Sequence, residues 1–572
     1  MSIKKITFGT PESIVPSKFC KGFSYKEGNI SFNVSSICHQ KLGGGYLLEF
    51  PISADEQIYG LGLQLKSFNL KSKKMTLRVN SDPIAPTGDS HSPVPFFVTT
   101  ANRGFYFDTA RAAEFYLGYS KLGQKAMDSA MGGGTDELYK AVTEENETTV
   151  GIKIPAADGV DLYIIEGKNI ADVVSQYNMM SGGGCDVPDW GLGTLFRCYY
   201  KYNENDILNI AAHLKENDLP CSVLGFEPGW QSKAYSCSFV KSEELYPNFD
   251  ETVKKLRKMG YHINLWEHCF THNTSPIYND LLDVSGNYLV WNGLVPDFTT
   301  EKARKVFADY HRKYLVDIGV DGFKLDECDS SDFNPRNWSF PNIAQFPGGA
   351  DGEQMHALLG TLYCQTMMEA MDYKPTLGEV RSLGALAAPY PYVLYSDLYD
   401  HNDFIQGLVN SGFSGLLWAP ELRSVNSGRE LLRRLQVLVF SPQCVINAWF
   451  CEERYPWTPY GCEKEVRKLL HLREKLIPRL KKAFDVYHKT GYPPIRALVM
   501  DFTDDTETYN VNDQYMFCDN ILVAPISAES ESDERKVYLP KGKWVDFFTR
   551  KETGSGWIDV KTKGIPVFEK ID

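Results

Sequence analysis

Residues 322–326 read Gly322-Phe323-Lys324-Leu325-Asp326, a short strand-like run that ends in a carboxylate. The run follows a helical stretch at 301–318, and the same order of helix and then strand recurs at 206–226 and 249–266. Short apolar strands that alternate with helices over roughly 300 residues are typical of a parallel sheet. The pattern predicts an α/β protein whose sheet closes into a (β/α)8 TIM barrel. An open doubly wound sheet is the alternative, but no GxGxxG turn supports it.

The segments on either side of this region have a β pattern. Short alternating apolar runs separated by Gly, Pro, Asn and Asp predict an N-terminal β-sandwich. Within it, glycine triplets at 43–45 and 132–134 are interpreted as turns. Strand-like runs near the end of the chain predict a C-terminal β-sheet domain. We therefore expect three domains, with the limits 1–185, 186–483 and 484–572.

The composition describes a soluble globular protein. Of 572 residues, 43% are hydrophobic and 23% are charged, which excludes a disordered or fibrous chain. No run of ~18 apolar residues occurs, so we expect no transmembrane span and no membrane partner. The formal net charge of -13 argues against nucleic acid as a partner.

The cysteines and the N-terminus bear on the compartment. The thirteen cysteines are an odd number, they are scattered, and no two of them form a CxxC pair. Such usage fits reduced thiols better than a disulfide framework. Residues 1–8 begin with a basic stretch but have no apolar segment after it, so we expect no signal peptide. The prediction is a cytoplasmic protein.

Carboxylates stand where several barrel strands are expected to end. Aromatic residues recur beside them, and the carboxylates are Glu227, Glu267, Asp326, Asp397 and Glu421. In a barrel, polar residues at the carboxyl ends of the strands form the active site. Two carboxylates can attack an anomeric carbon and protonate the leaving oxygen, while aromatic faces stack on the sugar ring. The pattern favours a sugar-cleaving site.

Plainer interpretations stay open for each of these residues. A strand-end Asp is often a helix cap, and the tryptophans at 230, 266 and 418 could be core. A cation site is a third interpretation, with candidate ligands Asp326, Glu327, Asp329 and Asp332, or the pairs His268 with His272 and His471 with Glu474. Because neither histidine pair has a third ligand in an obvious motif, we expect no metal and no cofactor.

The stretch 319–326, GVDGFKLD, resembles the nucleophile motif of glycoside hydrolase family 31. Further family-like segments follow in the same order: Arg381-Ser382, Tyr390-Pro391, Tyr395-Ser396-Asp397, 415–418 and 432–442. Segments in both flanks agree, at 59–62, 513–525 and 538–544. The chain is thus similar to this α-glucosidase and α-xylosidase family over nearly its whole length.

The resemblance implies retaining hydrolysis of α-glycosides. Asp326 then matches the nucleophile that forms a covalent glycosyl-enzyme intermediate. Asp397, 71 residues further on, matches the general acid/base. A retaining pair of carboxyl groups lies ~5–5.5 Å apart. Glu421 competes with Asp397 for the acid/base role, because it is a second carboxylate expected at a strand end.

The resemblance also implies substrate-binding residues. Positions that match the family are Asp82, Tyr200, Trp230, Trp266, Lys324 and Arg381. Other positions depart from the pattern of many members, namely Glu227, Glu421 and Asn447. Because a site built for one hydroxyl pattern rejects others, these departures put glucose as the substrate in doubt.

We therefore expect an enzyme that cleaves terminal α-linked sugars from small oligosaccharides or glycosides, of α-galactosidase or α-glucosidase type. The alternatives are an α-xylosidase, an α-transglycosylase, a metal-dependent barrel hydrolase and a carbohydrate-binding pseudoenzyme. The expected partner is a carbohydrate substrate, and a homo-oligomer stays open.

Overall fold

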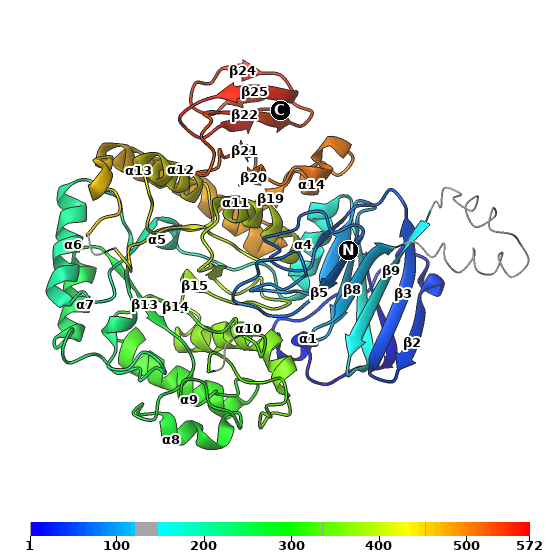
Figure 1. Ribbon diagram of the computed structural model, residues 1–572, viewed down its shortest axis with the longest axis horizontal. Helices are drawn as coiled ribbons and strands as arrows, with labels where there is room; N and C mark the ends of the chain where they lie inside the picture. The colour runs from blue at the N-terminus through cyan, green and yellow to red at the C-terminus, as the bar shows by residue number, and fades with distance from the viewer. Residues whose placement is uncertain (1, 120–146, 335–336, 452–453) are drawn as a thin grey trace, which may run out of the picture.

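The computed structural model describes residues 2–119, 147–334, 337–451 and 454–572. Figure 1 shows a β-sandwich at the N-terminal end, a barrel surrounded by helices, and a smaller β domain beside helices α12 and α13. The predicted fold class is confirmed. The glycine triplet at 132–134, interpreted as a turn, lies outside the described residues.

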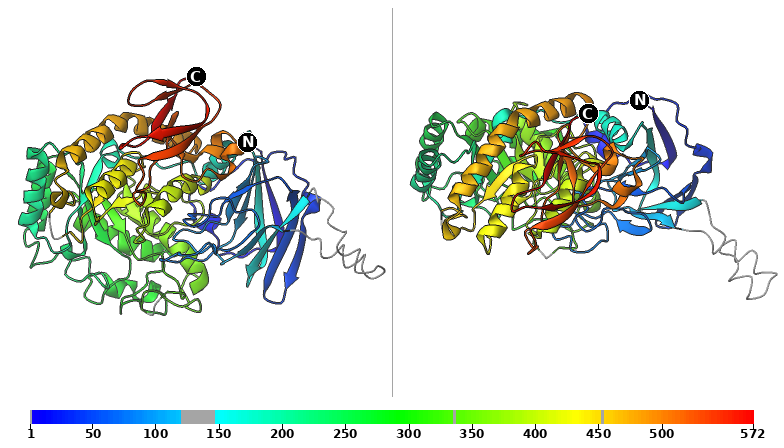
Figure 2. Two further views of the ribbon diagram at one scale, coloured as in Figure 1. Left: turned by 45° about the horizontal axis from the view of Figure 1, so that its top comes forward. Right: turned by 90° about the horizontal axis from the view of Figure 1, so that it is seen from above.

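The N-terminal part consists of two five-stranded antiparallel sheets, which face each other in the views of Figure 2. One sheet has the order β1 (Ser2–Thr10), β10 (Asp158–Glu166), β7 (Arg103–Asp108), β6 (Phe96–Thr99) and β4 (Ile58–Gly60). The other has the order β2 (Cys38–Leu42), β3 (Gly45–Ser53), β9 (Glu147–Pro155), β8 (Glu114–Tyr119) and β5 (Lys73–Thr76). Alternating residues such as Leu48, Phe105 and Ile152 are fully buried between them, as the period of a strand requires.

Eight parallel strands form the barrel. In chain order they are β11 (Thr194–Arg197), β12 (Val223–Phe226), β13 (His262–Glu267), β14 (Gly322–Leu325), β15 (Gly378–Val380), β16 (Tyr392–Leu394), β17 (Glu421–Leu422) and β18 (Cys444–Asn447). Each strand from β11 to β15 pairs with the next in the chain, and β18 pairs with both β11 and β17. The residues of β11 and β12 are all buried because both faces of the sheet are covered.

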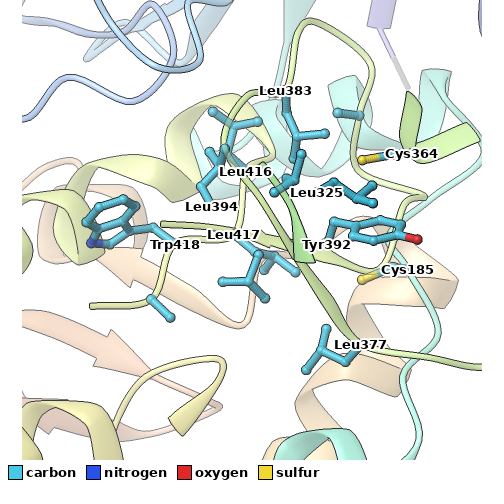
Figure 3. Packing of buried hydrophobic residues seen from close by; sticks show 14 of the residues in the cluster. Cys185, Leu325, Cys364, Leu377, Leu383, Tyr392, Leu394, Leu416, Leu417 and Trp418 are labelled. Atoms are coloured by element: carbon cyan, nitrogen blue, oxygen red, sulfur yellow. The ribbon is translucent and has the colours of Figure 1, made fainter. Parts of the chain in front are cut away.

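The residues just before β17 close the barrel. The Leu394 amide donates to the carbonyl of Leu417 over 2.8 Å, and the Ala419 amide donates to the carbonyl of Leu394 over 3.1 Å. Figure 3 shows Leu394, Leu416, Leu417 and Trp418 close together at this seam. The sheet is therefore closed into a barrel, and the carboxyl ends of its strands surround one common centre.

Amphipathic helices cover the outside of the barrel. They are α6 (Glu204–Glu216), α7 (Phe249–Lys258), α9 (Glu301–His311), α10 (Gly352–Ala370), α11 (His401–Asn410), α12 (Gly428–Val439) and α13 (Glu463–Thr490). In α6, the buried residues Ile207, Ile210, Ala211 and Leu214 recur at helical spacing and form one face. A capping box between Asn203 and Asp206 begins this helix.

The C-terminal part carries a six-stranded sheet of order β19 (Ile495–Ala497), β20 (Tyr515–Phe517), β21 (Ile521–Val523), β26 (Val567–Lys570), β23 (Trp544–Asp546) and β24 (Glu552–Thr553), and a hairpin of β22 (Glu534–Leu539) and β25 (Gly556–Lys561). The long helix α13 precedes it, and position 483, a predicted domain limit, lies inside that helix. The domain limits stay a prediction.

Within the described part of the chain, no helix is long and apolar enough to cross a membrane.

A fully buried arginine on α13 ties the first barrel strand to the last. The Arg473 guanidinium donates to the carbonyls of Leu192, Val439, Ser441 and Pro442, over 2.6 to 3.0 Å. Leu192 precedes β11, and the other three residues precede β18. One side chain thus satisfies carbonyl groups that water cannot reach.

We predict that Arg473→Met lowers the free energy of unfolding by roughly 3 kcal/mol, because buried carbonyls lose their donors. Lys482→Met is the control, since Lys482 lies on the same helix but is exposed and pairs only with exposed Asp519. Urea unfolding followed by tryptophan fluorescence measures both. Equal stability of the two variants would show that these bonds do not hold the strands together.

Candidate active site

Each barrel strand carries a polar side chain near its carboxyl end, except that Glu421 is the first residue of the two-residue strand β17. In strand order, these are Arg197, Glu227, Trp266, Asp326, Arg381, Asp397, Glu421 and Asn447. Lys324 lies within β14 and completes the set. Carboxyl ends of parallel strands meet on one face of a closed barrel, so residues up to 250 positions apart in the chain converge.

Asp326 and Asp397 are held by the same guanidinium. Arg381 Nη1 lies 2.8 Å from Asp397 Oδ2, and Arg381 Nε lies 3.8 Å from Asp326 Oδ1. The indole of Trp266 donates to Asp326 Oδ2 over 2.6 Å, and the Glu327 amide donates to Oδ1 over 2.8 Å. Both oxygens of Asp326 therefore have a fixed orientation.

The Asp397 side chain is 59% exposed, unlike most of its neighbours. A second arginine reaches it, because Arg423 Nη1 lies 3.5 Å from Asp397 Oδ1. Burial by itself would raise the pKa of Asp397, but the cations Arg381, Lys324 and Arg423 hold this pKa at about 2. Asp397 is therefore an accessible and ionised carboxylate.

Glu421 is enclosed beside it. Only 1% of the residue is exposed, and Asn447 Nδ2 donates to Oε2 over 2.9 Å. Arg423 Nε lies 3.3 Å from Oε1, so one arginine serves Glu421 and Asp397 together. Burial raises the pKa of Glu421 despite Arg423, Lys324 and the Asn447 amide. Glu421 and Asp397, the two acid/base candidates, thus differ in solvent exposure and in the direction of their pKa shifts.

A buried ion cluster lies deeper in the barrel. Arg197 is fully buried, binds Glu379 through two hydrogen bonds, and lies 3.1 Å from Glu227 Oε1. Lys324 Nζ lies 3.6 Å from the same Glu227 oxygen. Burial raises the pKa of Glu227, although Lys324 and Arg197 oppose it. Burial lowers the pKa of Lys324, but the carboxylates Glu227, Asp326 and Glu421 together leave it above the usual value.

The N-terminal sandwich contributes a residue that the sequence analysis missed. His91 is fully buried, with Nδ1 2.8 Å from Asp329 Oδ2 and Nε2 2.8 Å from Ser396 Oγ. Asp329 Oδ2 in turn accepts from Arg381 Nε over 3.0 Å. A chain of polar contacts thus joins the loop after β14, the loop after β16 and the arginine between them.

Four participants lay outside the predicted set: His91, Arg197, Glu379 and Arg423. Arg197 and Glu379 were open to prediction, because each lies on a strand that ends in the site. No local signal marks His91, since its partners lie more than 200 residues away in the chain.

Trp230, which the family resemblance places in the first subsite, lies behind Trp266. It is 0% exposed, it packs on Phe249, and its indole donates to the carbonyl of Trp266 over 2.6 Å. This burial fits the alternative interpretation of Trp230 as a core residue that supports Trp266. Its contact with the substrate stays a prediction.

Two further predicted residues lie outside the contact network described above. Tyr200 follows β11 and packs its ring 6.2 Å from that of Trp449. Asp82 is exposed on a sandwich loop that Asn334, from the loop after β14, holds by bonding Asn80 and Ser81. Their roles stay predictions.

Asp326 and Asp329 after β14 bind protein partners, and across the described ranges no group of three or more His, Cys, Asp or Glu side chains is arranged to hold a metal ion. His268 is buried, which lowers its pKa to about 3. His471 is exposed and lies 2.9 Å from Asp218. The chemistry available here is that of carboxylates and cations.

We predict that Arg197→Met costs about 3–5 kcal/mol of unfolding free energy at pH 8, because it leaves buried carboxylates without a counter-ion. Loss of the cation raises the folded-state pKa of Glu227 further. A glutamate has a pKa near 4.3 in the unfolded chain. When its pKa is higher in the folded state, the group stabilises the fold at low pH, and this stabilisation is lost as the pH rises through the folded-state pKa. The deficit relative to wild type should therefore be smaller at pH 5.

Urea unfolding of wild type and variant at the two pH values tests this. Arg467→Met is the control, because Arg467 pairs with Glu463 on the surface of α13. A deficit that is equal at both pH values would contradict the account of Glu227.

The chain is similar to known proteins in sequence and in structure. Residues 185–483 match the glycosyl hydrolases family 31 TIM-barrel domain, and residues 491–571 match the family 31 C-terminal domain. An α-glucosidase 2 of Bacillus thermoamyloliquefaciens is 25% identical over 90% of this chain and 66% of that protein. An α-xylosidase of Emericella nidulans is 23% identical over the same shares. The chain thus spans about two thirds of the length of these relatives.

Solved structures share the fold. A family 31 dextranase of Flavobacterium johnsoniae, in complex with glucose, superimposes with a TM-score of 0.79 at 22% identity, covering 94% of this chain and 68% of that one. The barrel model alone matches more than half of the chain. The chain therefore belongs to glycosyl hydrolase family 31.

Proposed function

We propose that this protein is a retaining α-glycoside hydrolase, with Asp326 as nucleophile and Asp397 as general acid/base. The observation that carries the proposal is the shared guanidinium of Arg381, which lies 3.8 Å from Asp326 and 2.8 Å from Asp397. Two carboxylates beside one guanidinium are near enough to act on the same glycosidic bond, and the retaining course is proposed from the family to which the chain belongs.

The reaction has two displacements. Asp326 forms a bond to the anomeric carbon while Asp397 gives a proton to the glycosidic oxygen, so that the alcohol leaves and a glycosyl ester remains. Asp397 then takes a proton from water, whose oxygen attacks the anomeric carbon and releases Asp326. Trp266 donates to Oδ2 and the Glu327 amide donates to Oδ1, so the carboxylate of Asp326 is held in one orientation for the attack.

Asp397 must gain a proton before the first step. At a pKa of about 2 it is ionised in the free protein, held so chiefly by Arg381. When sugar hydroxyls engage Arg381, the carboxylate loses part of its counter-charge and its pKa rises. Substrate binding would thus prepare the acid. Glu421 is the second candidate for this role, because its pKa is already raised.

The identity of the sugar is proposed from the buried polar side chains at the bottom of the site, which we call the polar base. Glu227, Lys324, Glu421 and Asn447 are fixed by mutual contacts, which suits recognition of a defined hydroxyl pattern. We propose an α-galactosidase or α-glucosidase that acts on small glycosides, with an α-xylosidase or α-transglycosylase as alternative. The names of the relatives, α-glucosidase and α-xylosidase, support the class but not one sugar.

The protein is further proposed to be cytoplasmic. Buried free thiols at Cys185, Cys198 and Cys237 support this, because such thiols fit a reducing compartment.

Three variants test the roles on a panel of aryl α-glycosides. We predict that Asp326→Ala abolishes turnover and that Asp397→Ala lowers kcat/KM by more than 10³-fold on a poor leaving group but much less on dinitrophenolate, which needs no proton. Azide should rescue Asp397→Ala and give the α-glycosyl azide by retention.

Glu421→Gln is the matched control, since it removes the competing carboxylate. If azide rescues Glu421→Gln and not Asp397→Ala, the acid/base is Glu421. If no glycoside in the panel is cleaved by folded wild type, the hydrolase proposal fails in favour of a carbohydrate-binding pseudoenzyme.

A separate prediction concerns His91 as a positioning residue. His91→Ala should lower kcat about 100-fold, with little change in KM, because the loop that bears Asp397 loses its anchor through Ser396. His39→Ala is the control, since His39 lies in the same sandwich and contacts Tyr46. An unchanged kcat in steady-state kinetics would rule out the positioning role.

A further inference from the structure

We propose that Tyr235, Trp291 and Trp338 form a platform that binds the leaving group of the substrate, and that this leaving group presents a flat apolar face. The proposal rests on the hydrolase function above. It adds a binding site on the other side of the scissile bond from the polar base of the barrel.

The three rings form a continuous series that begins at the nucleophile. Trp266, which donates to Asp326, lies 5.6 Å from Tyr235 between ring centroids. Tyr235 lies 5.1 Å from Trp291, and Trp291 lies 6.5 Å from Trp338. A group that leaves from a carbon beside Asp326 therefore meets aromatic side chains immediately.

The rings stay open to solvent. Tyr235 is 54% exposed and Trp338 is 43% exposed, which is unusual for large aromatic side chains. The ring planes of Trp266, His268 and Trp291 are tilted by 50°, 51° and 84° from that of Tyr235, so none of them lies parallel to it. Because about half of Tyr235 is exposed, part of this ring is open to a flat partner.

Three separate loops supply these rings. Tyr235 follows β12, Trp291 lies between β13 and α9, and Trp338 lies between β14 and α10. All three loops leave the carboxyl ends of neighbouring strands, the face that carries the catalytic carboxylates. Exposed apolar groups that gather beside a polar site mark a binding surface rather than random exposure.

The two sides of the site differ in polarity, so they suit different parts of the substrate. The base of the site consists of buried ionic groups such as Glu227, Lys324 and Glu421, which suit a ring with many hydroxyls. The platform offers ring faces, which bind the C–H face of a pyranose or an aryl ring by stacking. The shared chemistry is therefore a flat apolar face, from a second sugar or from an aromatic alcohol.

The test compares leaving groups of different size on one glycone. Substrates are the α-glycosyl fluoride, the p-nitrophenyl α-glycoside and a disaccharide. In Tyr235→Ala and in Trp338→Ala, we expect kcat/KM to fall at least 10-fold for a bulky leaving group and less than 2-fold for fluoride, which is too small to touch the platform. Phe548→Ala, an equally exposed site in the C-terminal part, should change none of them.

The possible outcomes distinguish the two kinds of leaving group, and they distinguish failure of the platform from failure of the hydrolase function. A loss confined to the disaccharide identifies a sugar, and a loss confined to the aryl glycoside identifies an aromatic alcohol. An equal loss for fluoride, or no loss at all, overturns the platform. If wild type cleaves none of the three, the hydrolase function fails. Calorimetric binding of the aryl glycoside to wild type and Tyr235→Ala then decides the platform alone, because equal affinity would overturn it.

Discussion

The contact on which the site depends is that of Arg381 with three carboxylates. Its guanidinium lies within 4 Å of Asp326, Asp329 and Asp397, and burial of this cation is tolerable only because these charges surround it. The same cation lowers the pKa of Asp397 and orients Asp329. The orientation of Asp326, the proposed nucleophile, and the ionisation of Asp397, the proposed acid/base, are therefore coupled through one side chain.

The rest of the structure holds this contact in place. The barrel supplies strand ends that converge, and hydrogen bonds around Leu394 close the ring so that β16 and β17 lie beside each other. The sandwich adds His91, which joins the loops after β14 and β16 from outside the barrel. Below the site, Arg197 neutralises Glu379 and Glu227, so that the polar base withstands burial.

Much of this arrangement was predictable from the sequence. The alternation of strands and helices predicts a barrel, and a barrel brings Asp326, Asp397 and Glu421 to one face. What the sequence could not predict depends on contacts between distant segments: His91 meets Asp329 only after two domains pack together. Trp230 was placed against the substrate, but its exposure is set by neighbours that no local pattern reveals. Likewise, the opposite pKa shifts of Asp397 and Glu421 depend on tertiary structure, because burial raises the pKa of Glu421 whereas Arg381, from another strand, lowers that of Asp397.

Trapping the glycosyl-enzyme tests the central claim most directly. A 5-fluoro glycosyl fluoride of the preferred sugar slows the second displacement, so the ester should accumulate on the intact protein. Mass spectrometry of a protease digest should then find one added sugar on the peptide that contains Asp326, and none in Asp326→Ala. A label on another carboxylate, or turnover of a glycoside without any covalent adduct, would contradict the assignment of Asp326 as nucleophile.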